Sequence, residues 1–313
     1  MTPRAMFLLF VCTFLLVPAS QARTWLVSKT DPRGVKSFYD LDYDRMQPGD
    51  IVVVRPGVYK EVIQAVNGIK YLARGKVFID EIRIENSFGV TIDGFRLDGD
   101  KKKRQTGISV VDSKKIKILN CRIREFEEGI SISRSQNVTI EKVLINDTER
   151  GLFLFRANRV TLKRSLIAHL PPRRDVVNAD VGIEINGGSI VTIDHNTLVR
   201  NGGAAIVANG ADRMKFTNNI VAFNGWGLQI ESPGNRIFDH NLLYKNSNGD
   251  QKESPFPGTP LPLSKGIHFF FNPAFVDSEI GDWRLENKSS ASKKDRNGSY
   301  LGAFPPVPPS DEL

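Results

Sequence analysis

Short runs in which apolar and polar residues alternate fill the middle of the chain, as in residues 130–133 (ISIS) and 138–140 (VTI). A period of two places successive side chains on opposite faces of a β-strand. Glycine, asparagine, arginine or serine separates the runs, as expected for turns. The pattern therefore predicts many short strands, each with one buried face.

These runs recur as a repeat. Six units align without gaps, beginning at Gly107, Gly129, Gly151, Gly182, Ala205 and Gly227. Their starts are separated by 22, 22, 31, 23 and 22 residues, so one interval carries about nine extra residues. A partial unit at residues 90–97 (VTIDGFRL) extends the array towards the N-terminus. A unit of this length with three strands predicts one coil of a parallel β-solenoid, whereas helical repeats need about 33 residues and a 3.6-residue period.

The alignment also assigns columns of residues that stack from coil to coil. Asn196, Asn219 and Asn241 share one column, and their side-chain amides are expected to form a structural ladder that satisfies buried polar groups. Residues 201, 224 and 246 are asparagines in a second such column. Cys121 falls in the first column, which predicts a buried and unreactive thiol.

The repeat pattern G-I-x-I-x-x-S-x-N-V-T-I-x-x-N-x-I resembles that of right-handed parallel β-helix proteins, the pectate-lyase-like superfamily with its parallel β-helix (PbH1) repeats. The resemblance covers residues 90–243. Residues 46–63 are similar to the first coil of such proteins, and residues 271–285 and 301–304 resemble their closing segment. It implies an all-β, single-stranded solenoid domain over residues 23–304, with a short helix near residues 37–46 as its N-terminal cap. It also implies that polymers bind along the outer face of the strand that follows the repeated glycine.

The N-terminus has the features of a secretory signal peptide at residues 1–22. Arg4 precedes the apolar run 5–17, and small residues stand at the −3 and −1 positions of a cleavage after Ala22. An uncleaved anchor is the alternative, but the run is shorter than the roughly 20 residues that span a bilayer. We therefore expect an exported protein, periplasmic or extracellular, without stable membrane insertion. A long loop is expected at residues 247–266 and a Pro-rich disordered tail at 305–313.

Amino-acid composition limits the kinds of partner and of covalent cross-link that we expect. The chain has 43 Lys and Arg against 35 Asp and Glu, so its net charge is +8, or +7 once Arg4 is removed. This positive charge fits an acidic partner. Because the chain carries an export signal, we expect that partner to be a polyanionic glycan and not nucleic acid. Cleavage also leaves Cys121 as the only thiol, which excludes an intrachain disulfide. We expect a monomer.

Alternation predicts a polar and aromatic outer face beside the insertion at residues 170–180 (LPPRRDVVNAD). Glu184, Arg156 and Asp180 are the candidate catalytic residues, since carboxyls can act as acid or base and, with an amide oxygen, can hold Ca²⁺. Aromatic rings stack on sugars and guanidinium groups pair with uronate or sulfate. The candidate substrate-binding residues are Phe153, Phe155, Arg134, Asn186, Arg173, Arg174 and Glu231. Alternatively, the insertion folds over the two phenylalanines as an apolar cluster.

Three functions remain open. An enzyme acting on an acidic polysaccharide is the first, and elimination by a lyase fits better than hydrolysis because basic groups outnumber paired acids on the expected face. The chain lacks a recognisable lyase signature, which favours the second, a non-catalytic protein that binds glycan or another envelope component. An accessory protein for assembly of another protein or metal site is the third, although four scattered histidines give it little support. The two Asp-His pairs, at 194–195 and 239–240, lie two coils apart, or about 10 Å, too far for one metal.

Overall fold

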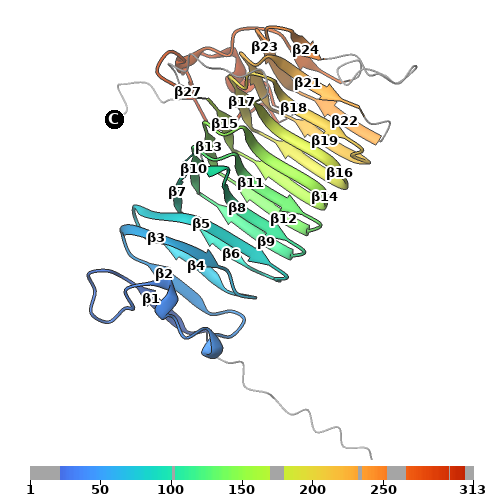
Figure 1. Cartoon of the computed structure of the whole chain (residues 1–313). Coiled ribbons are helices and arrows are strands. Elements are labelled where there is room, and N and C mark those ends of the chain that lie inside the picture. The colour runs from blue at the N-terminus through green and yellow to red at the C-terminus, as the bar shows by residue number, and fades with distance from the viewer. Residues whose placement is uncertain are drawn as a thin grey trace, which may run out of the picture.

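The computed structural model describes residues 22–100, 103–169, 180–231, 235–251, 266–295 and 297–306. Its strands wind into a right-handed parallel β-helix, as the repeat predicted (Figure 1). Ile130 pairs with Ile108 on one side and with Leu152 on the other, so one coil here is 22 residues. No helix among these residues is long and apolar enough to cross a membrane.

The strands form three parallel stacks, one for each side of the coil. The first stack contains β5 (Val77–Glu85), β8 (Thr106–Val111), β11 (Glu128–Ser133), β14 (Arg150–Lys163), β16 (Val181–Asp194), β18 (Ala204–Asn209), β21 (Trp226–Ile230) and β24 (Gly249–Gln251). The second contains β1 (Thr24–Val27), β2 (Ile51–Val54), β4 (Lys70–Ala73), β6 (Thr91–Asp93), β9 (Lys114–Leu119), β12 (Gln136–Glu141), the second halves of β14 and β16, β19 (Arg213–Thr217) and β22 (Asn235–Asp239). The third contains β3 (Gly57–Gln64), the start of β5, β7 (Arg96–Asp98), β10 (Arg122–Arg124), β13 (Leu144–Asn146), β15 (Leu166–Ala168), β17 (Thr197–Val199), β20 (Ile220–Ala222), β23 (Asn241–Tyr244) and β25 (His268–Phe269).

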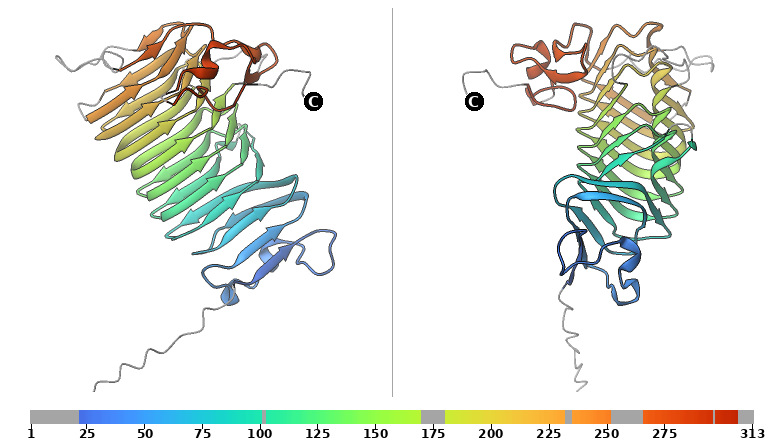
Figure 2. Two further views of the ribbon diagram at one scale, coloured as in Figure 1. Left: turned by 180° about the vertical axis from the view of Figure 1, so that it is seen from behind. Right: turned by 60° about the vertical axis from the view of Figure 1, so that its left-hand side comes forward.

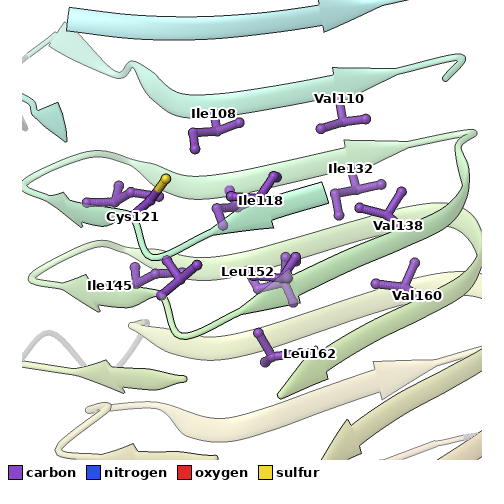
Figure 3. Close-up of a cluster of buried hydrophobic side chains, with 14 of the residues drawn as sticks. Ile108, Val110, Ile118, Cys121, Ile132, Val138, Ile145, Leu152, Val160 and Leu162 are labelled. Atoms are coloured by element: carbon purple, nitrogen blue, oxygen red, sulfur yellow. The ribbon is translucent and has the colours of Figure 1, made fainter. Parts of the chain in front are cut away.

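Stacked aliphatic side chains fill the interior of the coils. Ile108, Ile118, Ile132 and Leu152 point into this core from β8, β9, β11 and β14 (Figure 3). Each buried residue of this kind contributes about 1.5–3 kcal/mol relative to exposure. Cys121 is fully buried among them, so the expectation of a buried cysteine is confirmed, and burial raises the pKa of its thiol to about 12.

Two short 3₁₀ turns cover the first coil in place of the single helix expected there. They are η1 (Phe38–Asp40) and η2 (Tyr43–Arg45). The Ser37 hydroxyl accepts a hydrogen bond from the backbone N–H of Tyr39 and so begins η1, while extended backbone at Leu41 ends it. Phe38 is buried against Tyr59 with the ring centroids 5.7 Å apart, so the turns close the open end of the core.

The segment after β25 folds back over the outer side of the third stack (Figure 2). It contains the antiparallel pair β26 (Phe275–Asp277) and β27 (Asp282–Leu285) and the 3₁₀ turn η5 (Ser290–Lys293). Its side chains bury an apolar outer surface in a second core of residues 166, 168, 199, 220, 222, 242, 275, 283, 285, 291 and 301. We call residues 269–306 the closing segment.

An ion-paired histidine fastens the closing segment to the β-helix. Nδ1 of His195 lies 2.8 Å from Asp194, and Nε2 lies 3.3 Å from Asp295 of the closing segment. Burial alone favours the neutral ring, but the contacts with both carboxylates outweigh it and raise the pKa of His195. For Asp194, burial is likewise outweighed by hydrogen bonds from His195, Thr217 and Asn218, and its pKa falls to about 2.

We therefore predict that the closing segment is held more firmly when His195 is protonated. A raised folded-state pKa gives stability that is present below the unfolded-state value of about 6.5 and lost as pH rises through the folded-state value. The wild-type Tm should fall between about pH 6 and pH 8.5, and His195→Gln should reduce this fall. His240→Gln is the matched control, because His240 occupies the same column and lies 3.0 Å from Asp239, but within the described residues it makes no ion pair with the closing segment. Equal slopes for wild type and His195→Gln would contradict the assignment.

Candidate functional site

The outward side chains of β14, β16, β18 and β21 form one continuous surface, which we call the sheet face. Parallel pairing aligns Phe153 with Glu184, Glu184 with Val207, and Val207 with Gln229. The next outward row aligns residues 155, 186 and 209. The structure thus places Phe153, Phe155, Glu184 and Asn186 in the stacked order expected from alternation.

Arg150 is the centre of a charged network on the sheet face. Its Nη2 lies 2.7 Å from Oε1 of Glu128 and 3.6 Å from Glu127, and its Nη1 lies 3.7 Å from Oε2 of Glu184. The guanidinium also covers the ring of Phe153 at 4.8 Å. One cation thus orders three carboxylates and an aromatic ring in adjacent coils.

Glu184 is held from a second side by amide groups. Nδ2 of Asn186 donates to Oε1 of Glu184 at 2.7 Å, and Nδ2 of Asn209 donates to Oδ1 of Asn186 at 3.4 Å. The Glu184 side chain is only 21% exposed. Both of its oxygens are therefore engaged, and the carboxylate is fixed in an orientation suited to accepting hydroxyl hydrogen bonds from a ligand.

Arg156 and Arg134 share a turn column but differ in their partners. Arg134 makes two hydrogen bonds to the Asp112 carboxylate, at 2.8 and 2.7 Å, and these lower the pKa of Asp112. The guanidinium of Arg156 lies over the Phe155 ring at 5.1 Å. Arg156 is exposed and makes no ion pair with any of the described residues. Within the described part of the chain, a ligand at Arg156 would have no carboxylate to displace.

A hollow of about 430 Å³ lies on the same face, beyond Glu184. Trp226 forms one wall, and small residues such as Gly203 and Ala204 leave the space beside it open. Gln229 and Asn248 add polar groups to the rim. The full lining is Val181, Gly202, Gly203, Ala204, Val207, Trp226, Gln229 and Asn248. A half-exposed indole beside an open, partly polar hollow is suited to a flat sugar ring.

Asp180 lies away from the sheet face, in a buried cluster. Its side chain is 3% exposed, and Oδ2 lies 3.6 Å from Nε2 of His169. Nδ1 of His169 lies 3.6 Å from Asp147, one coil earlier. The sequence offered no partner for this histidine, and the structure supplies two. Glu231 is exposed directly after β21, and Arg173 and Arg174 lie outside the described residues.

Sequence reasoning missed three residues of this surface: Arg150, Glu128 and Trp226. All three belong to the outward row that precedes the repeated glycine, where Glu128 pairs with Arg150 and Ala204 pairs with Trp226. The signal was available, because extending the repeat alignment by one position would have placed them in a single column.

Metal ligands are not gathered anywhere in the part of the chain that the structure describes. Among those residues there is no group of three or more His, Cys, Asp or Glu side chains that could hold an ion. The Ca²⁺ site expected beside Glu184 therefore has no set of ligands among the described residues.

Solved structures with similar folds include several enzymes. Pectate lyase Pel9A superposes with a TM-score of 0.59 at 15% identity, covering 92% of this chain and 97% of that protein. An iota-carrageenase in complex with iota-carrageenan fragments superposes with a TM-score of 0.47 at 15% identity, covering 74% of this chain and 61% of that protein. The A-module of the Azotobacter vinelandii mannuronan C-5 epimerase AlgE6 gives 0.45 at 11% identity, with 83% and 91% covered. These identities show the fold alone. No protein of curated function matches the sequence.

A sequence family described as "Periplasmic copper-binding protein (NosD)" matches residues 64–254. The described residues hold no group of three or more His, Cys, Asp or Glu side chains that could bind copper. Cys121 is buried as a neutral thiol, Met214 is 2% exposed in the core, and His169 and His195 each lie between two carboxylates. The match nevertheless spans more than half of the chain, from β3 to just beyond β24. The chain therefore belongs to the NosD family.

Proposed function

We propose that the chain is an exported β-helix protein whose sheet face binds a polysaccharide. The observation that carries the proposal is the set of outward aromatic side chains on one face, Phe153 and Phe155 on β14 and Trp226 three coils further on, with the hollow beside the last. Sugar rings pack their C–H faces on such side chains, and the fixed Glu184 and Asn186 can bond to hydroxyl groups. Export is supported by the signal-like residues 1–22 and by the periplasmic description of the family.

An acidic glycan is the substrate class that we propose for this face. Arg150 is surrounded by carboxylates, so it adds little attraction for an anion. Arg156 has no such partner among the described residues, and its position over Phe155 lets one sugar contact both the ring and the guanidinium. We place the carboxylate or sulfate of the glycan at Arg156.

Binding without catalysis fits the described geometry better than elimination. A lyase needs a base that reaches the C5 proton and a group that neutralises the carboxylate. Both oxygens of Glu184 are engaged by Asn186 and Arg150, while Asp180 is buried beside His169. The guanidinium of Arg156 suits the neutralising role. Elimination is therefore the second proposal, with Arg156 and Glu184 as its residues.

Tryptophan fluorescence tests the binding proposal, because Trp226 is on the sheet face while Trp283 is buried and Trp25 bonds to Asp50. Oligogalacturonate, oligomannuronate, carrageenan fragments and a neutral mannan would be titrated into the protein. We expect an acidic glycan to change the emission. Calorimetric titration, which does not need the indole, then compares the variants: Trp226→Ala should weaken binding at least about tenfold, whereas Trp226→Phe should keep most of it. Wild-type affinity in Trp226→Ala would contradict the proposal.

The two turn arginines provide a matched pair for the acidic group. Arg156→Gln should weaken binding of acidic glycans and reduce its salt dependence, and Arg134→Gln should do so less because its guanidinium is already paired with Asp112. Absorbance near 232 nm in the same samples separates the two proposals, since a rise reports the unsaturated product of elimination.

A further inference from the structure

A second groove lies where the closing segment meets the turns that precede β10, β13 and β15. Its volume is about 580 Å³. The lining residues are Asn120, Cys121, Arg122, Lys142, Leu144, Arg164, Tyr300, Ala303, Phe304 and Pro305. We call it the cap groove. It belongs to the third strand stack and shares no lining residue with the hollow of the sheet face.

Three cations from adjacent coils surround the cap groove. Lys142 and Arg164 occupy the same turn column, and Arg122 projects outward from β10, where it pairs with Leu144. No ion pair reaches Arg122 or Lys142 from the described residues. Two acids lie beside the groove: Glu141 is 3.7 Å from Arg164 but closer to Lys163, at 3.1 Å, and Asp93 accepts a hydrogen bond from Nδ2 of Asn120 at 2.7 Å. Positive charges stacked about 5 Å apart repel one another and favour a bound anion.

The opposite wall of the cap groove is aromatic and firmly held. Tyr300, Phe304 and Pro305 come from the closing segment, and Leu144 contributes an apolar side chain from β13. The backbone N–H of Ala303 donates to Oγ1 of Thr197 at 2.9 Å, which anchors the segment beside the groove. A ring in the cap groove would therefore have apolar partners in Leu144, Tyr300 and Phe304.

We infer that the cap groove binds a ligand in which an anionic group, carboxylate or phosphate, is attached to a ring. The cations would face the anionic group, and the aromatic wall would face the ring. Ligand binding in the cap groove does not depend on polysaccharide binding on the sheet face, so experiments can contradict either proposal without the other.

Calorimetric titration of the full protein tests the inference with three ligands. Phenyl phosphate joins a phosphate to an aryl ring, galacturonate joins a carboxylate to a sugar ring, and inorganic phosphate carries charge without a ring. We expect phenyl phosphate or galacturonate to bind with a Kd below about 1 mM at low salt. Inorganic phosphate should bind at least about tenfold more weakly. Whichever ring compound binds identifies whether the ring is aryl or sugar.

The variants decide where the ligand sits. Arg122→Ala combined with Lys142→Ala should weaken binding at least about tenfold, and Phe304→Ala should weaken it with little change in salt dependence. Arg124→Ala is the matched control, because Arg124 projects from the same strand but is paired with Asp98 at 2.8 Å. Trp226→Ala should have no effect. The inference is overturned if neither ring compound binds, if inorganic phosphate binds as well as they do, or if the double variant retains wild-type affinity.

Discussion

Replacing Asn219 by alanine is expected to lower the free energy of unfolding by about 3–4 kcal/mol. The Asn219 side chain accepts hydrogen bonds from the backbone and side-chain N–H groups of Asn196, at 2.8 and 3.1 Å. It donates to the carbonyl of Ile193 and to Oδ1 of Asn241, both at 3.0 Å. Alanine removes all four bonds and takes the side-chain acceptor away from the buried backbone N–H of Asn196. Nδ2 of Asn196 keeps its bond to the carbonyl of Leu162, and Oδ1 of Asn241 keeps its bond from the backbone N–H of residue 219.

Urea unfolding followed by circular dichroism measures this loss. Asn235→Ala is the matched control, because Asn235 is exposed at the start of β22 and should change stability by less than about 0.5 kcal/mol. A repeat protein can unfold in segments, so tryptophan emission should be followed in parallel. A loss of under about 1 kcal/mol for Asn219→Ala would show that the ladder adds little.

The second large effect is expected at Asp50, which ties the start of β1 to the first coil. This carboxylate is 2% exposed and accepts bonds from the backbone N–H of Arg23 at 2.7 Å, Nε1 of Trp25 at 3.0 Å and the backbone N–H of Gln47 at 3.2 Å. Burial alone raises the pKa of Asp50, but these bonds outweigh burial and lower it. Asp50→Asn turns one acceptor oxygen into a donor and should cost about 2–3 kcal/mol.

The predicted cleavage after Ala22 would add a charge to this cluster. The nitrogen of Arg23 that bonds to Asp50 would then be the terminal ammonium group. A chain that begins at Arg23 should have a higher Tm than one that begins at Ala22, and the difference should vanish in Asp50→Asn. Because the folded-state pKa of Asp50 is lowered, this contribution is present above about pH 4 and is lost as pH falls further. Equal Tm values for the two wild-type chains would argue against the ion pair.

The sequence predicted the coil, the inward aliphatic rows and the outward order of Phe153, Glu184 and Gln229, because strict alternation survives within each strand. It did not reveal Arg150 or Trp226. Gly151 and Leu152 are both buried, so the alternation is broken between Arg150 and the rest of its strand. The alternation, followed back from Leu152, therefore ends at Gly151 and does not predict that Arg150 points outward.

The ion pairs were harder to predict, although the columns of stacked residues indicated some of them. Asp112, Arg134 and Arg156 occupy one turn column, which explains why Arg134 finds a carboxylate one coil earlier while Arg156 finds only another arginine. His169 contacts Asp147, 22 residues before it, and Asp180 on the far side of the insertion. The contact with Asp147 follows from the coil length. The contact with Asp180 depends on the path of the chain through the insertion, which the repeat period does not determine.

A crystal structure of the protein with the acidic oligosaccharide that binds most tightly would show whether the sheet face is the binding surface. We expect a sugar ring stacked on the indole of Trp226 and a carboxylate or sulfate within about 3 Å of the Arg156 guanidinium. An oligosaccharide bound on another side of the β-helix, with the sheet face bare, would contradict this expectation.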